Sequence, residues 1–324
     1  MNTHRRRITL AAGLAPLAAL LPRWASAAPL FESLSLFIPA APGGGWDTTG
    51  RVIEQVCRAA GLVGGVQFEN VGGAGGMVGL PKFVAQRKGQ GNWLLVGGSV
   101  MVGAGIANKS PVTIRNVVPI ARLTEEAGVV VVPASSPHRS WKDFAAALKA
   151  NPKGTSVAGG SAGGTDHLLL GMMIRELGAN PKEASYVAFA GGGAAVAAVI
   201  GGQVSAGISG YSEFAEHIKA GRLRAIAVSG NARIPGVDVP TLKELGVPIT
   251  TANWRGVFAP PGVSAAQQKA LTELMGAMHR SAQWKEQLEQ RKWVDVFLAG
   301  DDFARDVAED IRSTEAVMKD LGLA

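Results

Sequence analysis

The sequence predicts an α/β fold with mainly parallel sheets, organised as two domains. Short apolar segments alternate with amphipathic helical segments along the chain, and this alternation is typical of strands that are joined by covering helices. Strand after strand ends in a glycine cluster, and the chain contains 43 glycines. Once a leader of 27 residues is removed from the 324, the remaining 297 suit two domains of ordinary size.

The first 27 residues have the features of a cleaved signal peptide. Arg5–Arg7 precede an apolar run over residues 8–21, and Ala25–Ala27 forms an A-x-A cleavage site. The apolar run has 14 residues and contains Pro16, whereas a spanning helix needs roughly 20. We therefore expect residues 1–27 to be removed and the protein to reach the periplasm. The arginines are compatible with both the general and the twin-arginine export routes.

Removal of this leader changes the charge balance. The leader holds four of the 32 basic residues and no acidic one, so 28 basic and 25 acidic residues remain, a net charge of +3. No basic stripe with interleaved aromatic residues is left, which argues against nucleic acid as a partner. Cys57 is the only cysteine in the sequence, so an intramolecular disulfide is excluded and we expect a small buried apolar residue there.

Six predicted strands share one feature, which is that each runs directly into a glycine-rich loop. The strands are Ser35–Ala40, Val66–Asn70, Trp93–Val96, Thr155–Ala158, Tyr186–Ala190 and Val204–Ile208. The loops are Ala41–Asp47, Val71–Gly76, Gly97–Ser99, Gly159–Asp166, Gly191–Gly193 and Ser209–Tyr211. Glycine-rich turns can simply close αβ units, but six with the same strand–glycine–helix order favour a common cleft.

The remaining segments are predicted to form scaffold. Ser264 with Gln267 is typical of a capping box that opens a long helix, and Asp301–Leu321 is predicted as an amphipathic helix that ends at Gly322. The β-branched run after Pro119–Arg122 suggests a passage into a second lobe, with a return near Ala225–Val228. We therefore predict one lobe from residues 28–124 and 229–324, and a second lobe from residues 125–228.

The loop pattern predicts the chemistry of the cleft. In an open parallel sheet, loops at the carboxyl ends of strands lie together, and ligands bind there. Glycine allows main-chain amides to approach a ligand closely, and a helix begins with unpaired N–H groups and a partial positive charge. Several such ends make a site for carboxylates without lysine or arginine. We expect Gly44, Gly45, Ser161, Gly163 and Thr165 to donate hydrogen bonds to the ligand.

The other candidate residues have supporting roles. Asp47 and Asp166 each follow a glycine loop, and we expect them to cap their helices and fix the loops, at about 1 kcal/mol apiece. Trp46 and Tyr211 are candidates for the walls of the site, and Arg51 for a structural ion pair. The full set of candidate ligand-binding residues is Gly43, Gly44, Gly45, Trp46, Asp47, Ser99, Ser161, Ala162, Gly163, Thr165, Asp166, Gly192, Ser209 and Tyr211.

Catalytic and metal motifs are weaker. Residues 159–163 match G-x-S-x-G, the nucleophile elbow of α/β-hydrolases, and Asp238 and His279 follow in the required order. However, His279 lies in a predicted long helix, and abundant glycine makes the match easy, so a serine hydrolase that uses Ser161 is only an alternative. The histidines have no paired spacing for a metal, and the phosphate-binding glycine fingerprints are incomplete. We expect no cofactor and no metal.

The motifs together resemble a known family, the tripartite tricarboxylate transporter receptors, which are the Bug-type periplasmic solute-binding proteins. The segments that carry the resemblance are Pro42–Asp47 with Arg51, Glu69–Gly76, Asn108–Thr113, Gly159–His167, Ala190–Gly193, Ser209–Tyr211 and Asn253–Gly262. The resemblance covers essentially the whole chain after the leader. It implies a two-lobed periplasmic binding fold of the second topological type, with a ligand cleft between lobes that close on a hinge.

The resemblance also implies a function. Members of this family capture small organic acids and deliver them to the integral membrane subunits of a cation-coupled transporter. The versions of Trp46-Asp47 and Gly164–His167 found here are closer to the tricarboxylate receptors, so a di- or tricarboxylate such as citrate is the expected ligand. We expect a monomer. A periplasmic sensor that reports ligand occupancy to a membrane kinase would use the same fold, and it is the second alternative.

Overall fold

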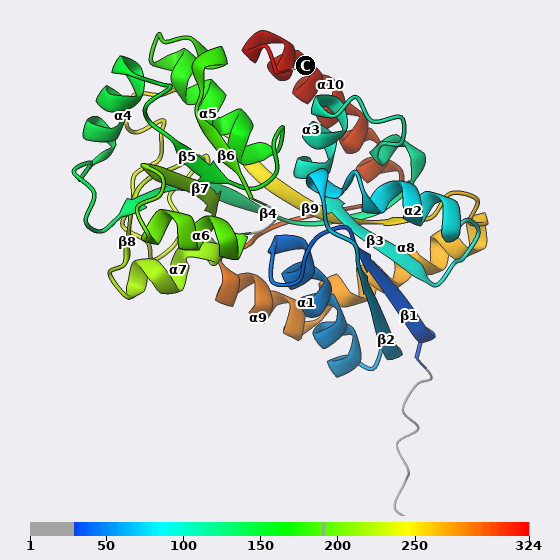
Figure 1. Ribbon diagram of the computed structural model, residues 1–324. Helices are drawn as coiled ribbons and strands as arrows, with labels where there is room; N and C mark the ends of the chain where they lie inside the picture. Colours follow the sequence, from blue (N-terminus) through cyan, green and yellow to red (C-terminus); the bar gives the residue numbers. More distant parts are fainter. Residues whose placement is uncertain (1–28, 190–191, 324) are drawn as a thin grey trace, which may run out of the picture.

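The computed structural model describes residues 29–189 and 192–323 and places them in two lobes that share a central strand (Figure 1). The predicted signal peptide, residues 1–27, lies outside the described residues. The strands are β1 (Phe31–Ile38), β2 (Val63–Asn70), β3 (Trp93–Gly98), β4 (Val118–Pro133), β5 (Val157–Gly159), β6 (Tyr186–Ala188), β7 (Ala206–Gly210), β8 (Leu223–Val228), β9 (Ala252–Ala259) and β10 (Val294–Ala299).

The helices pack on both faces of the sheets in each lobe (Figure 1). They are α1 (Gly45–Ala59), α2 (Gly79–Gln86), α3 (Ser99–Ala107), α4 (Trp141–Ala150), α5 (Thr165–Glu176), α6 (Gly192–Ile200), α7 (Tyr211–Lys219), α8 (Ala265–Arg280), α9 (Ala282–Arg291) and α10 (Asp301–Leu321). Short 3-10 helices are η1 (Ala74–Gly76), η2 (Ile114–Asn116) and η3 (Pro181–Glu183). In the described part of the chain, no helix combines the length and apolar character that crossing a membrane requires.

The sheet follows the order β2-β1-β3-β9-β4-β7-β5-β6, with β8 and β10 also paired to β4. The outer strand pairs are parallel, as the sequence predicts: β1 with β2 and β3, and β5 with β6 and β7. The central pairs are antiparallel, because β9 runs against both β3 and β4, and β4 runs against β7 and β8. The prediction of mainly parallel sheets therefore holds for the outer pairs but is wrong for the strands that connect the lobes.

Strand β4 belongs to both lobes. Its first part, over residues 118–127, pairs with β9, and its second part, over residues 128–133, pairs with β7 and β8. The first lobe has one apolar core around β1, β3 and β9, and the second lobe has two cores on opposite faces of β5 and β7. The predicted passage between lobes thus corresponds to one continuous strand.

The chain returns to the first lobe later than the sequence suggests. Residues 229–251 are assigned to the first lobe by the sequence prediction, but their buried side chains pack in the cores of the second lobe: Ile234, Val239, Leu242, Val247 and Ile249. This segment stays beside β8 because Val228 donates its N–H to the Pro240 carbonyl and accepts from the Leu242 N–H. The return takes place between Ile249 and β9.

The crossing between the lobes is fixed by one buried serine. Ser229 Oγ accepts from the Gly128 N–H at 2.9 Å and donates to the Thr251 carbonyl at 2.7 Å. The two chain segments that connect the lobes are therefore joined at the same point. A small apolar cluster of Leu168 from α5 with Met318 and Leu321 from α10 also links the lobes.

The scaffold predictions are confirmed. Ser264 and Gln267 form the capping box at the start of α8, and α10 spans Asp301–Leu321 and ends at the left-handed Gly322. Cys57 is fully buried in the first core. Arg51 pairs with Asp47 at 3.3 Å and stacks on the Phe68 ring, as a structural ion pair should.

Candidate functional site

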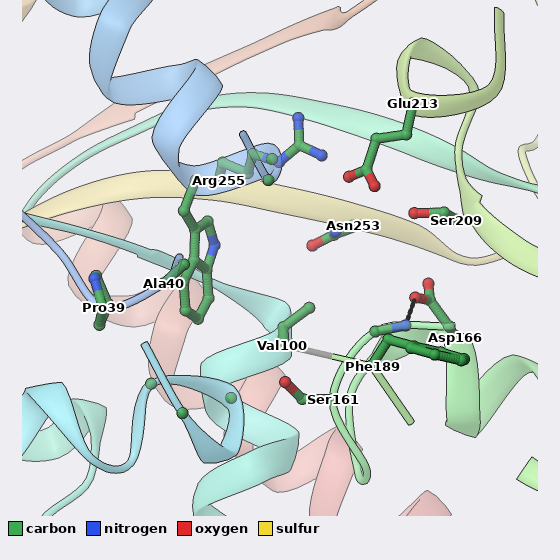
Figure 2. Close-up of a pocket in the computed structure, with 17 residues that line it drawn as sticks. Pro39, Ala40, Val100, Ser161, Asp166, Phe189, Ser209, Glu213, Asn253 and Arg255 are labelled. Atoms are coloured by element: carbon green, nitrogen blue, oxygen red, sulfur yellow. Dashed lines mark hydrogen bonds between the residues drawn. The ribbon is translucent and has the colours of Figure 1, made fainter. Parts of the chain in front are cut away.

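Four helices begin around one crevice between the lobes. Helices α1 and α3 come from the first lobe and α5 and α7 from the second, and each follows a strand of its own sheet. The crevice encloses about 670 Å³, part of it open to solvent, and residues from all four helix starts line it. Figure 2 shows side chains from both lobes turned toward this space. The loop at η1 adds Gly73, Gly75 and Gly76 to the wall.

The helix starts make the crevice rich in hydrogen-bond donors. In α1 the first intrahelical bond runs from Thr48 N–H to the Gly44 carbonyl, and in α5 it runs from Leu168 N–H to the Gly164 carbonyl. The preceding N–H groups of each helix, from Gly45 and from Thr165 onward, have no acceptor within their helix. Each helix start also carries a partial positive charge. An anion between the lobes is therefore favoured without a basic side chain.

The loop before α1 is fixed by Asp47. Its Oδ2 accepts from the Gly43 N–H at 3.0 Å, and its Oδ1 accepts from Asn70 Nδ2 at 2.9 Å. Asn70 Nδ2 also donates to the Ala40 carbonyl at 3.2 Å, so the loops after β1 and β2 are joined. Burial alone would raise the pKa of Asp47, but hydrogen bonds from Asn70, Gly43 and Arg51 outweigh it and lower that pKa. The N-cap residue of α1 is Gly44, which has no side chain to accept a capping hydrogen bond. Asp47 therefore fixes the loop as expected but is not the N-cap.

The loop before α5 is held in the same way from the second lobe, and its N-cap is Gly164, so Asp166 fixes the loop as expected but is not the N-cap. Asp166 Oδ2 accepts from the Gly160 N–H at 2.9 Å, and the Tyr186 hydroxyl donates to the Gly160 carbonyl at 2.9 Å. His167 stacks on the Tyr186 ring with centroids 4.4 Å apart. The backbone around Ser161 is thus positioned before any ligand arrives, which reduces the ordering cost of binding.

Gly163 has a structural role in this loop. Its N–H is donated to His167 Nδ1 at 3.1 Å, so the expectation that this amide serves a ligand is wrong for this structure. Its φ is +77°, and a Cβ there would lie 2.5 Å from Ala107 Cβ of the first lobe. The facing Gly103 has no room either, because its Cβ would lie 2.0 Å from the Gly163 carbonyl oxygen. The two glycines allow the lobes to touch backbone to backbone.

A buried ion pair adjoins the crevice, and its arginine, Arg255, is labelled in the upper part of Figure 2. Arg255 Nη2 on β9 is 2.9 Å from Glu126 Oε2 on β4, and both side chains are only 2% exposed. Glu126 Oε1 also accepts the Ser212 N–H at 2.6 Å, which occupies one donor at the start of α7. Gly45 lies against the guanidinium, because a Cβ there would be 2.7 Å from Arg255 Nη2.

Two further carboxyls face the crevice without a salt bridge in the described part of the chain: Asp166 and Glu213. Burial raises the pKa of Asp166 to about 6, although the Gly160 hydrogen bond and Arg255 act against the shift. Burial raises the pKa of Glu213 to about 7, opposed by Arg255 and reinforced by Glu126 and Asp166. Both groups lie deep between the lobes yet keep part of their surface open to the crevice. Each of the two carboxyls therefore titrates closer to neutral pH than an exposed acid does.

The predicted candidates differ in where they lie relative to the crevice. Those that line the crevice are Gly44, Gly45, Trp46, Ser161, Asp166 and Ser209. Gly43 lines an adjoining cavity on the far side of Arg255. Ser99 Oγ accepts from the Trp254 N–H at 3.0 Å and so joins α3 to β9. The candidates that do not line the crevice are Asp47, Ala162, Gly163, Thr165 and Tyr211, while Gly192 is the first residue of α6.

The predicted set of ligand-binding residues leaves out three polar side chains of the crevice, although Asn253 and Arg255 lie in a segment that carries the family resemblance. Glu213, Asn253 and Arg255 all line the crevice. Glu213 is the third residue of α7, two residues beyond the predicted loop at Ser209–Tyr211, and that spacing was a usable signal. Asn253 and Arg255 alternate along β9, which carries no glycine-rich loop at its start, so the loop pattern could not indicate them.

The hydrolase alternative finds no triad. Asp238 is exposed and pairs with Arg233 at 3.1 Å, and His279 Nε2 contacts Asp295 at 2.9 Å on a different surface. Ser161 therefore lacks both partners that the alternative requires. In the described part of the chain, no three His, Cys, Asp or Glu side chains gather in a way that could hold a metal ion.

Comparison with known proteins gives a consistent result. A family model described as "Tripartite tricarboxylate transporter family receptor" matches residues 51–323. The chain is 29% identical to protein BugT of Bordetella pertussis over 263 residues, which are 75% of this chain and 79% of BugT. It is also 29% identical over 265 residues to a UPF0065 protein of Agrobacterium vitis, covering 80% of this chain and 75% of that protein.

Solved structures show the same fold. The periplasmic binding protein BugD superposes with a TM-score of 0.80 at 23% identity, covering 90% of this chain and 98% of BugD. MatC from Rhodopseudomonas palustris, solved with bound malate, gives 0.79 at 25% identity, covering 89% and 99%. A second protein of that organism, solved with adipate, gives 0.79 at 22% identity, covering 90% and 97%. The predicted two-lobed periplasmic binding fold is thereby confirmed.

Proposed function

The chain belongs to the tripartite tricarboxylate transporter family of receptors, and on that basis we propose that it captures a small di- or tricarboxylate, such as citrate, between its lobes. The convergence of four helix starts on one interlobe crevice carries the proposal. Relatives of the same fold were solved with malate and with adipate. The ligand's first carboxylate is held by main-chain amides of the loops before α1 and α5, together with the Ser161 hydroxyl. The protein acts as a receptor and not as an enzyme.

Closure of the lobes completes the capture. An anion that contacts amides from both lobes favours the closed arrangement by what it gains across the crevice, because a ligand shifts an equilibrium only by its differential affinity. The two connecting segments joined at Ser229 form the hinge in this proposal. Residues 1–27 direct export, and the closed receptor then delivers its ligand to the membrane subunits of a transporter as a monomer.

Thermal melting of ligand-stripped protein tests the binding step. Protein refolded without ligand is melted with malate, adipate or citrate, and a true ligand at a hundred times its dissociation constant should add about 2.7 kcal/mol to the free energy of unfolding. The variant Val100→Trp fills the crevice that Val100 lines, so we expect it to fold but to lose this stabilisation.

A matched control and a second assay complete the test. Val294 is 51% exposed on β10, so Val294→Trp should respond to ligand like the wild type. If no carboxylate raises the melting temperature of the wild type, or if Val100→Trp responds equally, the proposed site is wrong. Delivery is tested by ligand-dependent capture of transporter subunits from solubilised membranes.

A further inference from the structure

The polar groups of the crevice are unevenly distributed. Main-chain donors lie on the glycine loops, and three side chains with acceptor atoms also line the crevice: Asp166 beside the loop before α5, and Glu213 and Asn253 away from that loop. Figure 2 shows the Glu213 carboxyl directed toward Asn253 and Ser209, from α7 of the second lobe. Asn253 Oδ1 is buried and, among the described residues, accepts no hydrogen bond. A ligand held by the glycine loops therefore presents its far end to the wall that Glu213 and Asn253 form.

The charge of this wall does not suit a second ligand carboxylate unless a proton is present. Arg255 is the basic residue that lines the crevice, and Glu126 already pairs with it at 2.9 Å. Asp166 and Glu213 then remain without a basic partner. An ionised Glu213 next to a carboxylate would repel it, whereas a neutral Glu213 has an O–H to donate, and such an O–H···O⁻ bond is strong.

We propose that Glu213 selects dicarboxylates by donating a hydrogen bond, as a neutral carboxylic acid, to the second carboxylate of the ligand. This inference rests on the proposed function. Each bound ligand leaves one proton on Glu213, this proton is taken up from solvent wherever Glu213 was ionised before binding, and the ligand stays a dianion. Asp166 is less suited to this role, because its Oδ2 already accepts the Gly160 N–H.

The surroundings of Glu213 support this protonation. Burial raises the pKa of Glu213 to about 7, while Arg255 and a hydrogen bond with Ser209 act in the opposite direction and the acids of β4 and α5 add to the rise. His217, one turn further along α7, and Arg291 of α9 line the adjoining cavity that Glu213 also borders. The carboxylate of a ligand adds a like charge beside Glu213 and raises its pKa further. At neutral pH the uptake is therefore favoured by ligand binding itself.

The proton count on binding tests the proposal. Malate binding is measured by titration calorimetry at pH 7.5 in phosphate and in Tris, whose ionisation heats differ. The wild type should take up between about 0.5 and 1 proton, and its affinity should fall up to about tenfold per pH unit above neutrality, as one linked proton requires. Glu213→Gln keeps a donor without a titrating group, so it should bind malate within about threefold of the wild type, independently of pH and without proton uptake.

The control is Glu216→Gln, an exposed position on the same helix, which should behave like the wild type. Binding of malate without proton uptake, or uptake that persists in Glu213→Gln, overturns the assignment of Glu213 but leaves the proposed function intact. Proton release would show that the wall receives a cationic group, and it also overturns the assignment. If neither malate, adipate nor citrate binds, both proposals fail. If the variant does not fold, an absence of proton uptake in the wild type still overturns the assignment.

Discussion

Replacement of Arg255 by methionine should destabilise the protein strongly. The side chain is 2% exposed, and its partner Glu126 is equally buried, so the substitution leaves a carboxylate in the interior with the Ser212 N–H as its remaining protein partner in the described part of the chain. Removing one member of a buried pair costs about 3–5 kcal/mol. With about 2 °C per kcal/mol for a chain of this size, the melting temperature should fall by roughly 6–10 °C.

Thermal denaturation of ligand-free protein, followed by circular dichroism at pH 7.5, measures this effect. Arg233→Met is the matched control, because Arg233 is 47% exposed and pairs with two exposed acids, and such pairs contribute about 0–1 kcal/mol. The double variant Glu126→Gln/Arg255→Met should recover part of the loss, since no unpaired charge remains and glutamine can still accept the Ser212 N–H. A loss no larger than that of Arg233→Met would refute the argument that this pair is buried and coupled.

Two further predictions concern stability. Gly163→Ala should lower the free energy of unfolding more than Gly178→Ala, because both glycines have φ +77° but a Cβ at 163 meets Ala107, whereas nothing lies within 4 Å at 178. Chemical denaturation should give a loss of about 1 kcal/mol for the backbone strain at 178 and at least twice that at 163. Equal losses would contradict the contact with Ala107. Ligand-free protein should also melt at a lower temperature at pH 8 than at pH 5.5. Three buried carboxyls have raised pKa values of about 6 to 7: Asp166, Glu213 and Asp310. The native state therefore holds more protons than the unfolded state between about pH 4 and 7, and stability falls as pH rises through that window. Burial lowers the pKa of His167, and this shift acts in the opposite direction. The net fall in melting temperature should be roughly 5 °C, and a melting temperature that rises with pH would contradict these shifts.

Local signals in the sequence predicted what depends on neighbouring residues. The glycine clusters after Ile38 and Gly159 correctly indicated helix starts at the carboxyl ends of strands, because backbone conformation is set by the residues at each turn. The sequence predicted the crossing into the second lobe near Val129 because a β-branched run continues there. The return was placed too early because β8 ends near Val228, and nothing local shows that residues 229–249 remain attached to its edge through Pro240 and Leu242.

The ion pair of Glu126 and Arg255 could not be predicted in the same way, because it depends on contacts between distant segments. Glu126 and Arg255 are 129 positions apart and meet only when β4 and β9 pair. Each residue alone is typical of a solvated surface charge, and only in the folded chain are both side chains as little as 2% exposed. The same reason explains Gly163, whose N–H looks available in the sequence until α5 brings His167 beneath it.

Selectivity within such a site must come from the wall that lies away from the loops before α1 and α5. Main-chain amides at the starts of α1 and α5 are present whatever side chains surround them, so in the proposed function they hold a carboxylate but cannot distinguish one acid from another. The length and charge of the remainder of the ligand are sensed only by groups on the far side, where Glu213, Asn253 and Ser209 lie. A substitution among these three should therefore change which acid is bound, whereas a substitution that disturbs the loop before α1 should weaken all acids together.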